Sequence, residues 1–171
     1  MNLATPAPAP VLASTAALCA ALADVLLQRN WKLATAESCT GGMIAAACTD
    51  LGGSSAWFER GMVTYSNEAK IEMLGVAAGL IERFGAVSEE VVRAMAQGAI
   101  TRSRAQVALA VTGVAGPTGG SRNKPVGTVW FGWAVNGQLH SEARHFGGNR
   151  HAVRSATVQH ALQRLSTLLQ Q

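Results

Sequence analysis

Two short apolar segments each run directly into a glycine-bearing loop, and this arrangement constrains the fold more than any other feature. Residues 32–36 (KLATA) lead into Glu-Ser-Cys-Thr-Gly-Gly, and residues 106–111 (QVALAV) lead into the loop 113–120 (GVAGPTGG). Nearly continuous apolar runs of this length are typical of strands buried on both faces of a sheet. Ligands of open α/β sheets bind beyond the carboxyl ends of parallel strands. We therefore expect the two loops to lie together and to form a binding crevice.

The rest of the chain alternates between helical and strand-like periodicity. An Asn136-Gly137 pair between two alternating segments is a strong signal for a β-hairpin. Strand–loop–helix units followed by a hairpin predict an α/β fold, a single three-layer α/β/α domain with a mixed sheet. The further helices are expected at 11–29, 43–48, 68–74, 77–84, 89–104 and 149–169, and the further strands at 58–66, 126–135 and 138–146.

Composition limits the class of protein. The 171 residues are 49% hydrophobic, which is enough to bury a core. Residues 1–10 (MNLATPAPAP) alternate proline and alanine and predict a flexible leader before a domain over 11–171. They lack the basic and apolar regions of a signal peptide, and no apolar run approaches the ~18 residues of a membrane helix. Membrane insertion is therefore not expected.

The cysteines and charges narrow the choice of cofactors and partners. The three cysteines, Cys19, Cys39 and Cys48, show no metal-ligand spacing. Their number is small and odd, which argues against a disulfide scaffold. Reduced thiols indicate a cytoplasmic protein. We also expect no metal and no cofactor. The net charge of +4 comes from scattered Lys and Arg residues, whereas nucleic-acid binders usually show a basic stripe. A small anionic substrate needs only one or two of these cations. The sequence leaves the number of subunits open and allows a homo-oligomer.

Ser38 is the first candidate for a chemical role. It follows a predicted strand and precedes a predicted helix, so its hydroxyl is expected near the positive end of the helix dipole, beside free backbone N–H groups. Those groups could bind an oxyanion, and the glycine pair lets a substrate approach the backbone, so Thr40, Gly41 and Gly42 are candidate substrate-binding residues. The alternative is that Ser38 only caps the helix. The segment is not the G-x-S-x-G elbow of many hydrolases. Cys39 is a rival nucleophile.

A serine nucleophile needs a base, and the chain offers two kinds. Lys70 follows Tyr65 at a strand end (YSNEAK), and a lysine buried there can lose its proton near neutral pH. Serine–lysine pairs are a known variant of the serine–histidine logic. The competing interpretations are a solvated helix lysine and a tyrosine that only packs. The histidines, all late in the chain, are the other option, with His145 as the fallback base.

The second glycine loop is a candidate anion site. Loops of this kind can present N–H groups to a phosphate or carboxylate, which makes Gly113 and Gly116 candidates. Thr112 at the strand end could add a hydroxyl, and Lys124 and Arg150 are candidate cations for the anion. The loop is neither a P-loop nor a dinucleotide fingerprint. A merely tight connection between two strands, with ordinary surface charges, is the alternative.

Several longer segments together resemble one family, the C-terminal domain of the competence/damage-inducible protein CinA. The resemblance extends from about Leu18 to about Gln163. The family includes nicotinamide-nucleotide amidases. The larger members carry a further domain, so this chain looks like the stand-alone form. The matching segments are TAESCTGG, SSAWFERGMVTYSNEAK, GAVSEE and TGVAGPTGG followed by KPVGTVWFG.

The resemblance implies hydrolysis of the carboxamide of nicotinamide mononucleotide to nicotinate mononucleotide and ammonia, a step of pyridine nucleotide recycling. It further implies a metal-free site with Ser38 as nucleophile, Lys70 as base and Tyr65 in their proton network, and with Thr112 and the Gly113 loop lining it. A non-catalytic module that binds a pyridine nucleotide or another phosphorylated ligand is the alternative. A DNA-related role is a third hypothesis and has less support.

Overall fold

The computed structural model describes residues 13–171, so the predicted leader at 1–10 lies outside the described residues. Within the described chain, the elements follow the predicted order, with most boundaries shifted by only a few residues. They are α1 (Thr15–Gln28), β1 (Leu33–Glu37), α2 (Met43–Thr49), the short 3-10 helix η1 (Ser54–Ala56), β2 (Phe58–Val63), α3 (Asn67–Leu74), α4 (Ala78–Phe84), α5 (Glu89–Thr101), β3 (Val107–Gly113), β4 (Thr128–Val135), β5 (Gln138–His145) and α6 (Arg150–Leu168).

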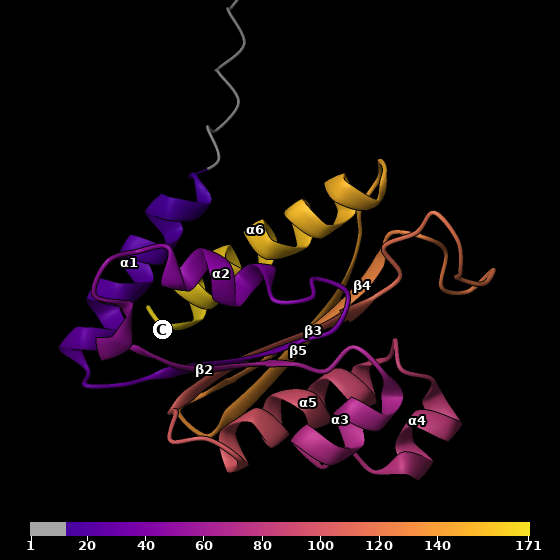
Figure 1. Cartoon of the computed structure of the whole chain (residues 1–171), viewed down its shortest axis with the longest axis horizontal. Coiled ribbons are helices and arrows are strands. Elements are labelled where there is room, and N and C mark those ends of the chain that lie inside the picture. Colours follow the sequence, from indigo (N-terminus) through magenta and orange to yellow (C-terminus); the bar gives the residue numbers. More distant parts are fainter. Residues whose placement is uncertain (1–12) are drawn as a thin grey trace, which may run out of the picture.

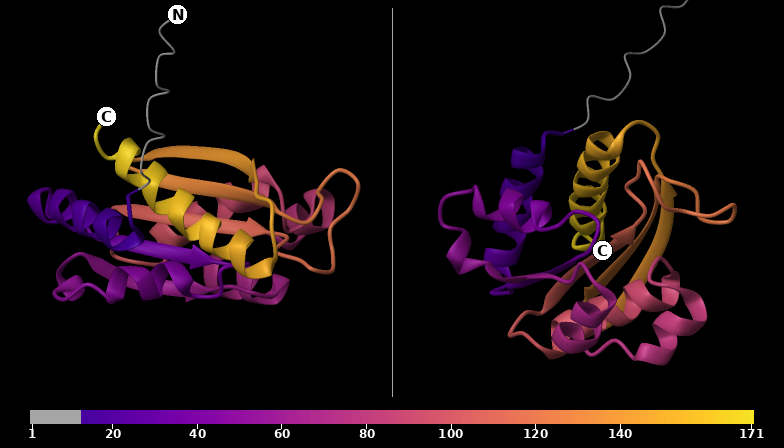
Figure 2. Two further views of the ribbon diagram at one scale, coloured as in Figure 1. Left: turned by 90° about the horizontal axis from the view of Figure 1, so that it is seen from above. Right: turned by 45° about the vertical axis from the view of Figure 1, so that its right-hand side comes forward.

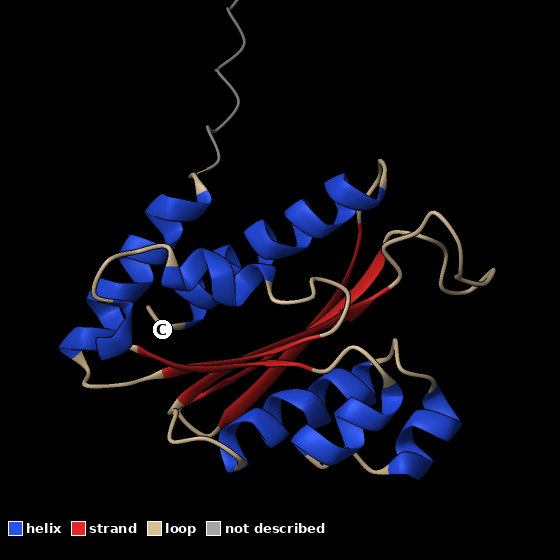
Figure 3. Ribbon diagram, in the orientation of Figure 1, coloured by secondary structure: helices blue, strands red, loops and turns tan. Residues whose placement is uncertain are grey.

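The five strands form one mixed sheet in the order β2-β1-β3-β4-β5. The central strand β1 is parallel to both β2 and β3, whereas β4 and β5 continue the sheet as an antiparallel hairpin. Helices α1, α2 and α6 cover one face and α3, α4 and α5 cover the other (Figures 1 and 3). The predicted three-layer α/β/α domain with a mixed sheet is therefore confirmed.

Polar side chains cap four of the helices. The side chains of Ser14, Ser66, Ser88 and Asn149 each accept a hydrogen bond from an amide in the first turn. Such caps satisfy amides that have no partner within the helix. The capped helix α6 lies across the sheet, and the loop 114–127 projects beyond the end of the sheet (Figure 2).

The two faces of the sheet bury different kinds of side chain. Large residues such as Leu22, Trp133 and Leu165 fill the space below α1 and α6. On the other face the strands present mainly alanines to α5, including Ala34 and Ala108. Small residues on the sheet let α5 approach the strands closely. Helix α3 packs against the outer side of α5, also at short distance.

The close approach of α3 to α5 makes Gly98 a packing requirement. A Cβ placed on Gly98 would lie 2.1 Å from the Leu74 carbonyl oxygen. In an open helix, Gly→Ala would stabilise by about 0.5–1 kcal/mol. Overpacking of this kind costs about 1–3 kcal/mol, so we expect Gly98→Ala to lower the free energy of unfolding. The matched control is Gly79→Ala in α4, where nothing lies within 4 Å of the new Cβ. Urea unfolding should show a loss for Gly98→Ala and a small gain for Gly79→Ala; equal effects would contradict the packing argument.

No helix among residues 13–171 combines the length and the apolar character that crossing a membrane requires. The same residues contain no group of three or more His, Cys, Asp or Glu side chains placed to hold a metal ion. Cys19, Cys39 and Cys48 are all buried and free.

Candidate active site

The two glycine-bearing loops meet at the carboxyl ends of β1 and β3, as the sequence predicts. Ser38 directly follows β1, and its amide donates to the carbonyl oxygen of Val111 in β3 at 3.1 Å. A pocket of about 240 Å³ opens at this junction. It is lined by Ser38, Cys39, Tyr65, Asn67, Lys70, Ala86, Val87, Thr112, Gly113, Ala115 and Arg150.

Lys70 reaches Ser38 from helix α3. Lys70 is only 1% exposed, and its Nζ lies 3.0 Å from Ser38 Oγ. The same Nζ donates to the backbone carbonyls of Thr64 at 2.8 Å, Tyr65 at 3.2 Å and Ser66 at 3.4 Å. The Lys70 Nζ is thus surrounded by uncharged oxygen atoms.

The local sequence explains this arrangement. Ser66 caps α3 through a hydrogen bond from the Ala69 amide at 3.0 Å, which fixes the first residues of the helix. Lys70 stands one turn further on, and long helical side chains point back toward the N-terminus of their helix. Its Nζ therefore reaches the carbonyls that precede the helix, and Ser38 beyond them.

Burial determines the charge state that Lys70 prefers. Removal from water disfavours the ammonium form and lowers the pKa of Lys70 below its ordinary value. Among residues 13–171, none of the hydrogen-bond acceptors of Nζ carries a formal negative charge. A neutral Lys70 can donate its two N–H groups to backbone carbonyls and direct its lone pair at the Ser38 hydroxyl. The site can therefore hold a lysine that accepts a proton from serine.

The turn after Ser38 is held from one side by Glu37. This carboxylate is fully buried and accepts hydrogen bonds from the Thr40 hydroxyl at 2.7 Å and from the Gly42 amide at 3.1 Å. It also accepts from the Ile44 and Ala45 amides, at 3.0 and 2.8 Å. A carboxylate at this end of a helix is favoured by the helix dipole. The prediction of free N–H groups at the start of this helix is wrong for these amides, because Glu37 already occupies them.

The other predicted binding residues of the turn also bond within it. The Gly41 amide donates to the Ser38 carbonyl oxygen at 3.0 Å. Gly41 and Gly42 have φ values of 58° and 101°, which a residue with a side chain rarely adopts. Thr40, Gly41 and Gly42 thus shape the turn and lie outside the pocket lining. Among the described residues, the Cys39 and Thr40 amides take no part in the turn's backbone hydrogen bonds.

Arg154 of α6 holds the turn from the other side. Its Nε donates to the Cys39 carbonyl oxygen at 3.1 Å, and its Nη2 donates to the Thr40 carbonyl oxygen at 2.9 Å. The guanidinium fork thus spans two successive peptide groups of the nucleophile turn, and it does so from a helix more than 110 residues further along the chain.

Tyr65 is placed differently from the expectation. Its residue is 60% exposed, and its hydroxyl accepts a hydrogen bond from Arg150 Nη2 at 3.2 Å. Only its backbone carbonyl contacts Lys70. Arg150 also donates from Nη1 to the Gly116 carbonyl oxygen at 2.9 Å, so Gly116 meets this edge of the pocket through its oxygen. Arg150 and Tyr65 together form one wall of the pocket.

The second glycine loop contributes only part of what was expected. Thr112 and Gly113 line the pocket, and the Thr112 hydroxyl donates to the Ala86 carbonyl oxygen at 2.9 Å. A Cβ on Gly113 would lie 2.8 Å from the Thr128 carbonyl oxygen, so the close strand pairing requires glycine. Lys124 lies elsewhere: its Nζ donates to the Phe84 carbonyl oxygen at 2.7 Å. The structure does not bring Lys124 to the pocket.

The rival nucleophile and the fallback base are poorly placed. Cys39 is buried, and that burial raises the pKa of its thiol to about 11. At neutral pH the Cys39 side chain is therefore a protonated thiol, which is a weaker nucleophile than a thiolate. His145 is exposed at the end of β5, and His160 is paired with Glu142. The pocket lining holds neither histidine.

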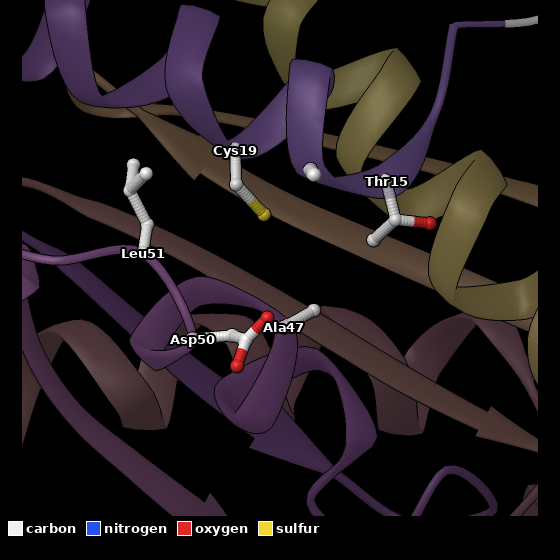
Figure 4. A pocket seen from close by; sticks show the side chains of 6 residues that line it. Thr15, Cys19, Ala47, Asp50 and Leu51 are labelled. Carbon is white, nitrogen blue, oxygen red and sulfur yellow. The ribbon is translucent and has the colours of Figure 1, made fainter.

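A second cavity of about 340 Å³ lies between α1 and α2 (Figure 4). It shares no lining residue with the pocket at Ser38 and exposes mainly apolar surface. Its walls are formed by Thr15, Ala16, Cys19, Ala47, Asp50 and Leu51.

Sequence reasoning assigned no role to two residues that organise the site. Glu37 is a single carboxylate at the end of an apolar strand and just before a helix start, which is a recognisable signal for an internal cap. Arg154 stands four residues after Arg150 on the same helix, so both lie on one face of α6. That spacing could have placed Arg154 at the site.

A single α/β domain with a buried serine–lysine pair at the carboxyl ends of parallel strands is the class that this fold and site define. The CinA C-terminal domain family matches residues 15–169, and the chain belongs to that family.

Named relatives and solved structures agree with this membership. The chain is 54% identical over 147 residues to the nicotinamide-nucleotide amidohydrolase PncC of Pseudomonas putida, covering 86% of this chain and 92% of that protein. It is 52% identical over 143 residues to the protein of the same name from Escherichia coli K12, covering 83% and 87%. The crystal structure of the competence damage-inducible protein A from Klebsiella pneumoniae superposes with a TM-score of 0.89 at 41% identity, covering 92% of this chain and 98% of that one.

Proposed function

We propose that this chain is a nicotinamide-nucleotide amidohydrolase, which converts nicotinamide mononucleotide and water to nicotinate mononucleotide and ammonia. The names of the relatives at 52–54% identity support this substrate. The observation that carries the reaction type is the buried Lys70 Nζ at 3.0 Å from Ser38 Oγ. A module that only binds nucleotides has no use for a buried lysine, because burial of an ionisable group is costly.

In the first half of the reaction, Ser38 Oγ attacks the carboxamide carbon while its proton passes to neutral Lys70. The carbonyl oxygen becomes an oxyanion, and the Cys39 and Thr40 amides are the donors in the turn that can stabilise it. Lys70, now protonated, gives its proton to the departing nitrogen as the C–N bond breaks. Ammonia leaves, and the nicotinoyl group remains as an ester on Ser38.

In the second half, water replaces ammonia. Neutral Lys70 accepts a proton from the water molecule as its oxygen attacks the ester carbon. The tetrahedral intermediate collapses, Ser38 Oγ recovers the proton from Lys70, and nicotinate mononucleotide departs. One base thus serves both steps, because each begins with a neutral lysine and ends with one.

The substrate phosphate needs a cation or N–H donors at the pocket edge. Arg150 lies in the pocket wall and uses Nη1 and Nη2 for one hydrogen bond each. A guanidinium has five N–H donors, so donors remain for a phosphate. We assign the phosphate to Arg150 rather than to Lys124, which is engaged at the Phe84 carbonyl.

The test is ammonia release by the purified chain from nicotinamide mononucleotide, with free nicotinamide as the matched substrate that lacks the ribose phosphate. We expect release from the nucleotide, little from nicotinamide, and no inhibition by a chelator, because the proposed chemistry uses only Ser38 and Lys70. Tight binding of the nucleotide without ammonia release would favour the binding-module alternative. Loss of activity in a chelator, restored by zinc, would contradict the metal-free mechanism.

A further inference from the structure

We propose that Arg154 is a positioning residue for this reaction, which fixes the peptide groups that stabilise the oxyanion; the inference rests on the proposed amidohydrolase function. Among the described residues, its guanidinium forms no hydrogen bond with Ser38 Oγ or with Lys70. It donates instead to the carbonyl oxygens of Cys39 and Thr40, at 3.1 and 2.9 Å.

The geometry of the peptide group links these carbonyls to the amides beside Ser38. The Cys39 carbonyl and the Thr40 amide belong to one planar peptide unit, and in a trans unit the C=O and N–H point in opposite directions. The cis peptide found in the described chain lies elsewhere, before Pro117. A guanidinium that holds the Cys39 carbonyl toward α6 therefore holds the Thr40 N–H away from α6. The same contact polarises the peptide and strengthens its N–H as a donor.

The turn depends on two opposite charges. The Glu37 carboxylate orders the Thr40 hydroxyl and the amides of Gly42, Ile44 and Ala45. Between Ser38 and Gly41, the Ser38 carbonyl accepts from the Gly41 amide and the Thr40 carbonyl also accepts from the Met43 amide at 3.2 Å. The Cys39 carbonyl has Arg154 as its hydrogen-bond partner in the described structure. The glycines that allow the turn also loosen it, because a glycine backbone has more conformations to lose on ordering. A turn with two glycines therefore depends more on hydrogen bonds from outside the turn, such as those of Arg154, than a turn without glycine does.

The attachment of α6 to the domain does not depend on Arg154. Asn149 caps the helix, and buried apolar residues such as Val153, Leu162 and Leu165 anchor it to the sheet. Loss of the Arg154 side chain should consequently leave the helix in place and release only the turn. Misplacement of catalytic groups by about 1 Å can cost 10²-fold in rate.

The experiment compares Arg154→Ala, Arg154→Lys and the matched control Arg164→Ala in the full chain. Arg164 lies on the same helix and faces Glu142 at 3.8 Å, away from the pocket lining. With nicotinamide mononucleotide as substrate, we expect Arg154→Ala to lower kcat by roughly 10- to 10²-fold with little change in KM. Arg154→Lys should retain an intermediate kcat because it keeps the charge but not the fork. Arg164→Ala should keep the wild-type kcat.

Chemical rescue separates positioning from general damage to the fold. Added guanidinium ion, at millimolar concentrations that leave the wild type unaffected, should restore part of the lost kcat of Arg154→Ala. An active wild type combined with an unaffected Arg154→Ala overturns the inference alone. An effect of Arg154→Ala on KM alone also overturns it. So does a loss of kcat in Arg154→Ala that guanidinium does not restore, if Arg154→Lys also unfolds at a lower urea concentration than the wild type. Absence of ammonia release from the wild type overturns the proposed function itself.

Discussion

Replacing Ser38 with alanine is expected to remove nearly all release of ammonia from nicotinamide mononucleotide. The change deletes the attacking oxygen and leaves Lys70 with only its three carbonyl acceptors. Loss of a nucleophile in comparable hydrolases costs several orders of magnitude, so we expect a fall in kcat on the order of 10³-fold or more. Initial rates of ammonia production measure the effect. Ser38 is 8% exposed and its side chain is small, so circular dichroism and the urea midpoint should change little.

The matched control for Ser38→Ala is Cys39→Ala. Cys39 is the adjacent residue, is equally buried, and its thiol pKa is raised to about 11, so it should not act as the nucleophile at neutral pH. Cys39→Ala should therefore keep most of the wild-type rate. A variant pair with the opposite behaviour, in which the cysteine change stops turnover and the serine change does not, would assign the nucleophile to sulfur.

Replacing Lys70 with alanine is expected to lower kcat by about 10²- to 10⁴-fold, the range for loss of a positioned general base. Lys70→Met keeps the length and apolar stem of the side chain and should lose as much, because it has no titratable nitrogen. Lys70→Arg should not restore activity, since a guanidinium stays protonated. Turnover in any of these variants close to the wild-type rate would remove Lys70 from the base role.

The pH dependence of the wild type follows from the lowered pKa of Lys70. The neutral amine is the active form, so kcat/KM should rise as pH increases through this pKa and then level off. The midpoint should lie below the ~10.4 of an ordinary lysine. In Lys70→Met this limb should be absent from any residual activity. A limb that persists unchanged in Lys70→Met would assign the titration to another group.

The same pKa difference has a consequence for stability. Between the lowered pKa in the folded protein and the ordinary pKa of the unfolded chain, the unfolded state binds more protons than the folded one. The contribution of Lys70 to the free energy of unfolding therefore rises with pH across this interval and is most unfavourable below it. Urea unfolding of wild type and Lys70→Met at several pH values should show this slope in the wild type alone.

Local patterns in the sequence determined most of the fold. Apolar runs at 32–36 and 106–111 predicted two neighbouring parallel strands, and Asn136-Gly137 predicted the hairpin of β4 and β5. These features are local in the chain, since strand burial, turn conformation and helix capping depend on residues a few positions apart. Some boundaries were wrong: the strand predicted at 58–66 ends at Val63, and the helix predicted at 89–104 ends at Thr101. The Thr64 amide still donates to the Glu37 carbonyl of β1, and the carbonyls of residues 64–66 accept from Lys70 Nζ.

The pairing of Ser38 with Lys70 could be anticipated because each residue has a local signal. Ser38 stands at a strand end before a glycine turn, and Lys70 stands in the first turn of the helix after the next strand. Parallel neighbours place such positions at one edge of the sheet. The tertiary structure then supplied the distance of 3.0 Å between their side-chain atoms and the burial that lowers the pKa of Lys70.

Only the tertiary structure decided how the surrounding polar groups are used. Glu37 occupies amides that the sequence left free for substrate, Tyr65 turns its hydroxyl to Arg150, and Lys124 bonds to Phe84. Arg154 reaches the Ser38 turn across 115 residues of chain. A long polar side chain can satisfy its hydrogen bonds with any partner that the fold brings within reach, and those partners are set by packing between distant segments, which no local pattern in the sequence records.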